Sequence, residues 1–165
     1  MNFKRTVKHL LATDRQVSRA FPARTLSAIE AAIQASEAAH VGELRFVVEG
    51  ALDGLPLFRG QSARERAIDL FSQLRLWDTE QNNGLLIYLL LADHAVEIVA
   101  DRGIDAKVGS QAWCTICQQM EAAFRQSNFE AGVLSGVQAV TQHLVQHFPA
   151  DGHNRNELSD APVLL

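Results

Sequence analysis

The stretch Asn83-Gly84-Leu85-Leu86-Ile87-Tyr88-Leu89-Leu90-Leu91 decides how this chain folds. Residues 85–91 carry no charge, and the hydroxyl of Tyr88 is their only polar side-chain group. A strand without polar alternation is buried on both faces of its sheet. We therefore expect a central strand at 85–91, with its odd-numbered residues facing one layer of helices and its even-numbered residues facing another.

Two further strands flank the central one. Residues 43–49 are rich in β-forming side chains, and residues 95–100 return after a short turn at Asp93-His94. The short turn predicts an antiparallel hairpin between residues 85–91 and 95–100. Residues 50–60 hold three glycines and a proline, which indicates a loop, and Ser62 with Glu65 then forms the capping box of a helix that runs to about residue 76.

The remaining elements are helices. Apolar residues at helical spacing predict helices over residues 3–20, 25–39, 110–125 and 129–148, with Asp14 as a point of interruption in the first. Helices must cover both faces of the apolar strand, so the fold class is α/β, a three-layer α/β/α sandwich with a small mixed sheet and an additional N-terminal helix. We expect an N-terminal helical extension at 1–20, a domain at 21–149 and a polar, flexible tail at 150–165.

Composition narrows the classes of function. The chain has 165 residues, 47% of them hydrophobic, and a net charge of −4, which disfavours a nucleic-acid partner. The longest apolar run, residues 85–92, is far shorter than a membrane-spanning helix, and the charged N-terminus does not resemble a signal peptide. Two cysteines are too few for a disulfide framework, so we expect a cytoplasmic protein with at most a peripheral association with membranes.

Two short patterns suggest chemistry in the C-terminal half. Cys114 and Cys117 follow Trp113, as in a thiol-exchange site, although no strand leads directly into them. His143 and His147 stand one helical turn apart, the spacing of two metal ligands, without the glutamate of a metalloprotease helix. Packing thiols and amphipathic boundary histidines are the ordinary explanations of both patterns.

Acidic residues near the hairpin predict a cation site. Asp78 lies in the loop before the central strand, Glu97 lies on the returning strand, and Asp101 ends that strand. Ca²⁺ and Mg²⁺ take oxygen ligands, and ligands favour the strand ends of an α/β sheet where the topology reverses. We therefore predict a cleft between the loops at 77–84 and 100–105, in which these three carboxylates bind Ca²⁺ or Mg²⁺. Solvated loop acids are the alternative.

Other residues of these loops would shape the cleft. We expect Thr79 and Asn83 to orient the ligands and Arg102 to face a phosphate. Gly84 would relieve crowding where the loop enters the strand, and Gly103 would allow the following turn. No glycine-rich phosphate loop or nucleophile elbow occurs in the chain.

The same residues carry a family resemblance. The run from Leu76 to Tyr88, with its Asn-Gly pair before an apolar strand, resembles the signature of the TPM domain. The segments 92–98 and 100–104 resemble that family's hairpin and the turn after it, and Phe124, Arg125, Phe129 and Gly132 resemble its helix junction. The tail at 156–162 looks like the ending of a short, anchor-free bacterial branch. The resemblance covers roughly residues 20–148.

The resemblance implies a fold and two activities. TPM domains are α/β/α sandwiches, and the family includes a thylakoid-lumen protein of photosystem II repair described as an acid phosphatase, and bacterial members reported to bind calcium. This chain differs where Phe21-Pro22 replaces an aspartate before the first long helix, and where Asp101-Arg102-Gly103 replaces a glycine-rich turn. If the chain hydrolyses phosphate esters, a metal-activated water would attack the phosphoryl group.

Two other functions remain open from the sequence. One is a non-enzymatic module that contacts a partner protein, at or near a membrane, through its basic N-terminal helix, where Lys4, Arg5, Lys8 and Arg15 form a mildly basic patch. The other is a thiol redox protein, which requires Cys114 and Cys117 to be exposed and reactive.

Overall fold

The computed structural model describes residues 3–12, 14–152 and 158–165. Within these residues the sheet has four strands in the order β3-β2-β1-β4. β1 spans Leu44–Glu49, β2 spans Leu85–Leu90, β3 spans Ala95–Ala100 and β4 spans Val163–Leu164. β1 is parallel to β2 and β4, and β3 is antiparallel to β2, so this is the small mixed sheet that the sequence predicts.

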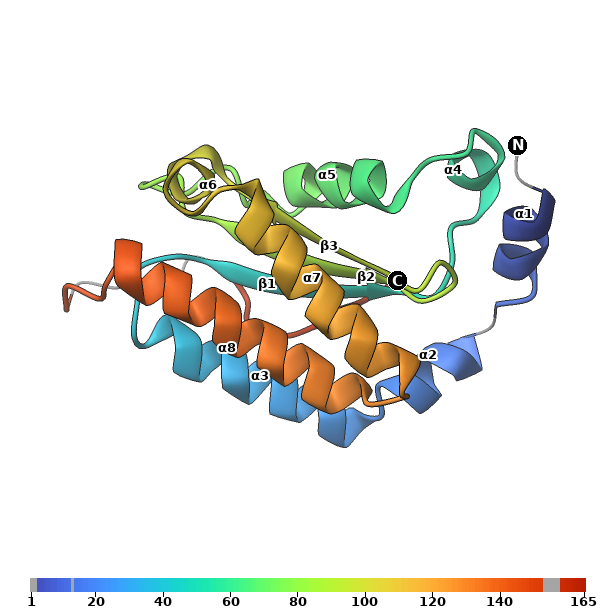
Figure 1. Cartoon of the computed structure of the whole chain (residues 1–165), viewed down its shortest axis with the longest axis horizontal. Coiled ribbons are helices and arrows are strands. Elements are labelled where there is room, and N and C mark those ends of the chain that lie inside the picture. The colour runs from blue at the N-terminus through green and yellow to red at the C-terminus, as the bar shows by residue number, and fades with distance from the viewer. Residues whose placement is uncertain (1–2, 13, 153–157) are drawn as a thin grey trace.

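Helices cover both faces of the sheet (Figure 1). On one face lie α3 (Ala23–Glu37), α7 (Ser110–Arg125) and α8 (Phe129–His147), and on the other lie α4 (Gly54–Phe58) and α5 (Ala63–Gln73). Every residue of β2 is buried, its odd-numbered residues in the core beneath α3, α7 and α8 and its even-numbered residues in the core beneath α5. The predicted α/β/α sandwich is confirmed, and so is the two-sided burial of its central strand.

Three segments differ from the sequence predictions because they hold short helices. The expected helix at 3–20 is two helices, α1 (Phe3–Leu10) and α2 (Asp14–Ala20), and α4 lies within the expected loop at 50–60. α6 (Arg102–Val108) fills part of the expected loop between β3 and α7. The side chain of Asp101 caps its first turn, and Gly109 ends it with a φ of +84°, so polar local signals define a helix too short for apolar periodicity to reveal.

The chain's last residues correct the prediction of a flexible tail at 150–165. Val163 and Leu164 pair in parallel with Val47 and Val48 of β1, and the N–H of Leu165 donates to the carbonyl of Val48 over 3.0 Å. Residues 163–165 are therefore part of the sheet, while residues 153–157 lie outside the described residues.

The predicted N-terminal extension divides in two. Val17 of α2 and the following Phe21 are buried in the main core, whereas α1 lies apart at one end of the molecule (Figure 1). No helix of the described residues is long and apolar enough to cross a bilayer.

Candidate functional site

The strand directions define two opposite edges of the sheet. β1 and β2 begin at one edge, which we call the amino edge, and β3 ends there because Ala100 pairs with Leu85. The loops at 77–84 and 100–105 therefore both lie at the amino edge. The opposite carboxyl edge holds the ends of β1 and β2 and the turn at Asp93-His94. Ligands of α/β sheets usually bind at the carboxyl ends of parallel strands. The cleft predicted at the loops 77–84 and 100–105 rests on this rule, but these loops lie at the amino edge. In the structure the same rule favours the carboxyl edge.

At the amino edge the two predicted loops lie side by side. The N–H of Asp101 donates to the carbonyl of Gly84 over 2.8 Å, and the N–H of Ile104 donates to the carbonyl of Asn82 over 3.3 Å. The Nε of Arg102 donates to Oδ1 of Asn82 over 3.0 Å. The guanidinium of Arg102 thus serves to hold the two loops together.

Gly84 and Gly103 allow this close approach. A Cβ atom on Gly84 would lie 1.9 Å from the carbonyl oxygen of Leu76, and one on Gly103 would lie 2.4 Å from that of Asn82. Both contacts are with backbone atoms, which cannot rotate away as a side chain can. Any larger residue at either position would push the loops apart.

Thr79 and Asn83 shape the loop before β2. The N–H of Asn83 donates to Oγ1 of Thr79 over 3.1 Å, and Nδ2 of Asn83 donates to the carbonyl of Val41 over 3.0 Å. Asn83 is almost completely buried. Its amide therefore ties this loop to the segment that enters β1.

The two carboxylate oxygens of Asp101 lie in different environments. Its Oδ1 accepts the N–H of Arg102 over 2.7 Å, as the cap of α6. Its Oδ2 is buried and has no hydrogen-bond partner among the described residues. A buried carboxylate oxygen without a partner is costly, because neither water nor a donor replaces its hydration.

The three predicted metal ligands do not form one group. Asp78 is exposed on the loop surface, and Glu97 lies on β3, opposite Tyr88. Four residues of extended strand separate Glu97 from Asp101, about 13 Å along the chain. Burial raises the pKa of Glu97 against the opposing charge of Arg64, whose Nη1 lies 3.6 Å from its Oε2. Among the described residues no three Asp, Glu, His or Cys side chains meet in a geometry that would hold a metal ion.

A buried acidic group lies at the same edge and was not predicted. Oε1 of Glu37 accepts the N–H of Leu44 over 2.9 Å, close to Glu43 and Asp160. Burial is the main reason why the pKa of Glu37 rises to about 8, and the two neighbouring carboxyl groups raise it further. Arg45, itself buried, lies near these acids, so one guanidinium faces three carboxyl groups.

The carboxyl edge holds a second polar cluster, which also was not predicted. Asp93, in the turn between β2 and β3, accepts from Arg5 of α1 through both of its oxygens, at 2.7–3.1 Å. His9 lies 3.0 Å from the same carboxylate through Nε2, and its Nδ1 accepts the N–H of Leu52 over 2.9 Å. Because Nδ1 accepts, Nε2 carries the proton and donates to Asp93. We call Arg5, His9 and Asp93 the α1 latch.

The α1 latch holds α1 with its polar side toward the protein and its apolar side toward solvent. Arg5 and His9 face the protein, whereas Phe3, Leu10 and Leu11 are 74%, 66% and 71% exposed. Together with Val7 these apolar residues form one stripe, which lies within about 100° of arc at 3.6 residues per turn. The spacing of these apolar residues predicts the helix but not the face that it presents to the protein. Their spacing together with Arg5 and His9 one turn apart was the available signal.

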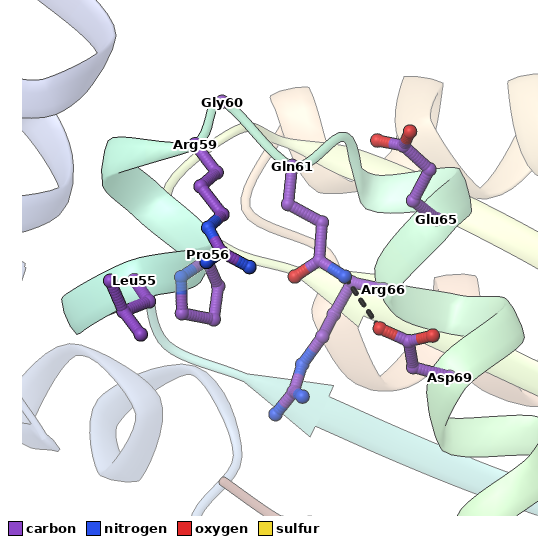
Figure 2. Close-up of a pocket in the computed structure, with 8 residues that line it drawn as sticks. All are labelled: Leu55, Pro56, Arg59, Gly60, Gln61, Glu65, Arg66 and Asp69. Carbon is purple, nitrogen blue, oxygen red and sulfur yellow. Dashed lines mark hydrogen bonds between the residues drawn. The ribbon is translucent and has the colours of Figure 1, made fainter.

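An open pocket of about 610 Å³ lies between α4 and α5 (Figure 2). Its charged groups largely pair with one another or with the core. Nε2 of Gln61 donates to Asp69 over 2.6 Å, and the guanidinium of Arg66 binds Glu49, which also accepts the hydroxyl of Tyr88. Arg66 therefore neutralises a buried carboxylate of the core and is not free to bind a ligand in the pocket.

The sequence patterns in the helices have structural explanations. Cys114 is exposed, but burial raises the pKa of Cys117 to about 12, which opposes the thiolate that disulfide exchange needs. The ring of His143 packs edge-on against Trp113, with ring centroids 5.4 Å apart. A Ser36–His40 pair is fully buried, and because Nδ1 of His40 accepts from Gly42, its Nε2 donates to Ser36 and cannot act as a base.

Comparison with known proteins places this architecture in a family. The TPM domain model matches residues 17–143. The BA42 protein of the psychrophilic bacterium Bizionia argentinensis, solved by NMR, has a similar structure, with a TM-score of 0.75, 28% identity, and coverage of 88% of this chain and 95% of that protein. The N-terminal domain of a P. gingivalis protein shares the fold, with a TM-score of 0.56, 22% identity and coverage of 77% and 76%. No curated protein matches. Since the family model spans most of the sequence, the chain belongs to the TPM domain family.

Proposed function

We propose that this TPM domain is a binding module that docks to its partner through the outward face of α1. The orientation of α1 supports this proposal. Soluble helices normally turn their apolar stripe toward the core, but this one is held by its polar side while its apolar stripe faces solvent. Contiguous exposed apolar side chains are typical of surfaces that bind another molecule.

The strength of the α1 latch supports the same function. Arg5 makes a bidentate contact with Asp93 and also donates to the carbonyl of Gln61 over 2.8 Å. Such charge-assisted contacts are among the stronger hydrogen bonds in proteins. The helix is therefore held ready for a partner, without the ordering cost that a free N-terminal segment would have on binding.

The test compares two matched pairs of substitutions in the cells that produce the protein. In Phe3→Ser with Leu10→Ser, two exposed apolar residues of α1 are removed, and in Ile68→Ser with Trp77→Ser, two exposed apolar residues outside it are removed. We expect the wild type and the second variant to migrate with a larger assembly or with membranes, and the first variant to migrate as the free 18.2 kDa chain. Identical migration of all three would contradict the proposal.

A divalent-cation site is the second candidate, favoured by the unpartnered Oδ2 of Asp101. Ca²⁺ or Mg²⁺ beside this oxygen would offset its lost hydration, with further oxygens from Asp78 and the loop at 77–84. Glu97 is too far along β3 to share that ion. The phosphatase reported for the family would be the activity to assay if the ion binds, and we assign no residue to that chemistry.

A melting experiment tests the cation site. We expect millimolar calcium or magnesium to raise the melting temperature of the wild type, because a ligand bound only by the folded state stabilises it. Asp78→Asn with Asp101→Asn should abolish the rise, and asparagine at 101 can still cap α6. A wild-type melting temperature that stays constant across the titration would exclude the site.

A further inference from the structure

A groove of about 640 Å³ lies between the helices α1 and α2 and the turn that joins β2 to β3. Its walls are apolar at Leu11, Leu91 and Phe129. Lys8, Arg19 and His94 also line it, and no carboxylate does. The groove thus combines an apolar floor with cationic and hydrogen-bonding groups, which is the pattern expected for an anionic amphiphile.

Within the part of the chain that the structure describes, Lys8 and Arg19 of this groove have no acidic partner. Among the described side chains no ion pair or hydrogen bond joins Lys8 or Arg19 to a carboxylate, whereas Asp93, the nearest acid in the turn, is occupied by Arg5 and His9. Burial lowers the pKa of His94, the positive charge of Lys8 lowers it further, and the negative charge of Asp93 opposes both. The imidazole of His94 carries an N–H in either protonation state, so it offers a hydrogen-bond donor in the same groove as two fixed positive charges.

The groove and the stripe of α1 form one surface. Leu11 belongs to both, and Lys8 stands on α1 between the stripe and the groove. The exposed lysines Lys4 and Lys8 flank the stripe on a single side, with the half-buried Arg5 and the buried His9 beyond them. A helix with apolar residues on one side and lysines beside them is typical of segments that lie in the interface of a bilayer.

We propose that this surface docks on an anionic lipid bilayer, with a lipid phosphate bound by Lys8, Arg19 and His94 and the stripe of α1 inserted at the acyl boundary. The inference deepens the proposed docking function by naming the partner, and it rests on that function. A bilayer matches both halves of the surface. Anionic headgroups attract lysine and arginine side chains, and the acyl boundary accepts Phe3, Leu10 and Leu11 without a complementary protein pocket.

Vesicle sedimentation tests the proposal with the full chain. We expect binding to vesicles of phosphatidylcholine with phosphatidylglycerol, little binding to pure phosphatidylcholine, and loss of binding as salt is raised. Lys8→Glu with Arg19→Glu should weaken binding by at least about tenfold, since each basic residue near an anionic surface contributes severalfold. Phe3→Ser with Leu10→Ser should weaken it comparably. Arg75→Glu, an exposed cation on the loop after α5, is the matched control and should bind as the wild type does.

Three outcomes would overturn the inference. Equal binding to neutral and anionic vesicles would exclude headgroup recognition, and binding that neither variant pair reduces would place the lipid contact elsewhere. The third is an absence of vesicle binding together with a mass that rises with concentration in light scattering and is restored to 18.2 kDa by Phe3→Ser with Leu10→Ser. In that outcome α1 still docks, but on a second copy of the chain, so the lipid inference fails while the docking function stands.

Discussion

The two edges of the sheet are held together by different kinds of contact. At the amino edge, backbone packs directly on backbone around Gly84 and Gly103, and Asn83 ties the loops together from within. At the carboxyl edge, side chains make the contacts, because the α1 latch holds a separate helix and leaves a groove beside it. The amino edge is therefore held by direct backbone packing, whereas the carboxyl edge carries exposed side chains and an open groove.

Substitution of Gly84 should have the largest effect and would test whether the amino edge is as rigid as its packing indicates. A side chain there must displace the backbone of Leu76, so we expect Gly84→Val to cost about 3 kcal/mol or more of unfolding free energy, measured by urea melts. Gly60→Ala is the control, because its Cβ meets nothing and only its φ of +72° opposes the change, at about 1 kcal/mol. Equal losses would mean that the loops can separate easily.

Glu37 should make the amino edge sensitive to pH. Its pKa is about 8 in the folded chain, above its ordinary value of 4.5, so its contribution to stability is complete below 4.5 and disappears as the pH rises through 8. We expect the wild type to lose on the order of 5 kcal/mol across that window relative to a variant without this carboxyl group, at about 1.4 kcal/mol per pKa unit.

Urea melts across this pH range should show a much flatter profile for Glu37→Gln, since the amide cannot ionise and its oxygen can still accept the N–H of Leu44. Glu80→Gln, an exposed acid of the same edge, should retain the wild-type slope. A Glu37→Gln variant with the same dependence on pH as the wild type between about pH 5 and 8 would show that Glu37 is ionised in the folded chain.

The α1 latch at the carboxyl edge should lose stability at low pH and not at high pH. This loss should be the smallest of the effects predicted. Burial opposes ionisation of Asp93, but the hydrogen bonds from Arg5 and His9 and the charge of Arg5 outweigh it and lower the pKa below 3.8. The latch is therefore complete above that value and is lost only as the pH falls through the lowered pKa. It should stay closed throughout the range in which the amino edge loosens.

Asp93→Asn should open α1 at neutral pH. This substitution removes the negative charge of the carboxylate that both Arg5 and His9 bind, and it should cost about 1–2 kcal/mol of stability. The loss should be confined to α1, because α1 lies outside the core. We expect the amide hydrogens of α1 to exchange about tenfold faster while those of β2 keep their rates. Asp78→Asn, at the amino edge, should change neither. If β2 exchanges faster too, α1 is part of the cooperative unit of the fold.

The sequence was most informative where burial alone determines structure. The unbroken apolar run of β2 predicts a central strand and its two helical layers, and the Ser62–Glu65 pattern predicts the capping box that begins α5. The Asn83-Gly84 pair identified the family, because close packing restricts which residues can stand there.

The sequence was least informative where the outcome depends on contacts between distant segments. The apolar spacing of α1 predicts a helix but not that Asp93 and Leu52 would hold its polar side inward. The predicted ligand set failed to gather because Glu97 and Asp101, four residues apart in the sequence, are separated along an extended strand. β4 was missed because two residues have no periodicity, and pairing with β1 alone defines them.

The position of β4 has a consequence for the order in which the chain folds. During synthesis β1, β2 and β3 emerge before β4 and can pair early, but the outer side of β1 stays open until Val163 and Leu164 have been made. Until Val163 and Leu164 arrive, the buried strand Leu44–Glu49 presents unpaired N–H and C=O groups along an open edge. Such an edge can pair with a neighbouring nascent chain, so β4 protects the sheet from edge-to-edge aggregation once it has paired with β1.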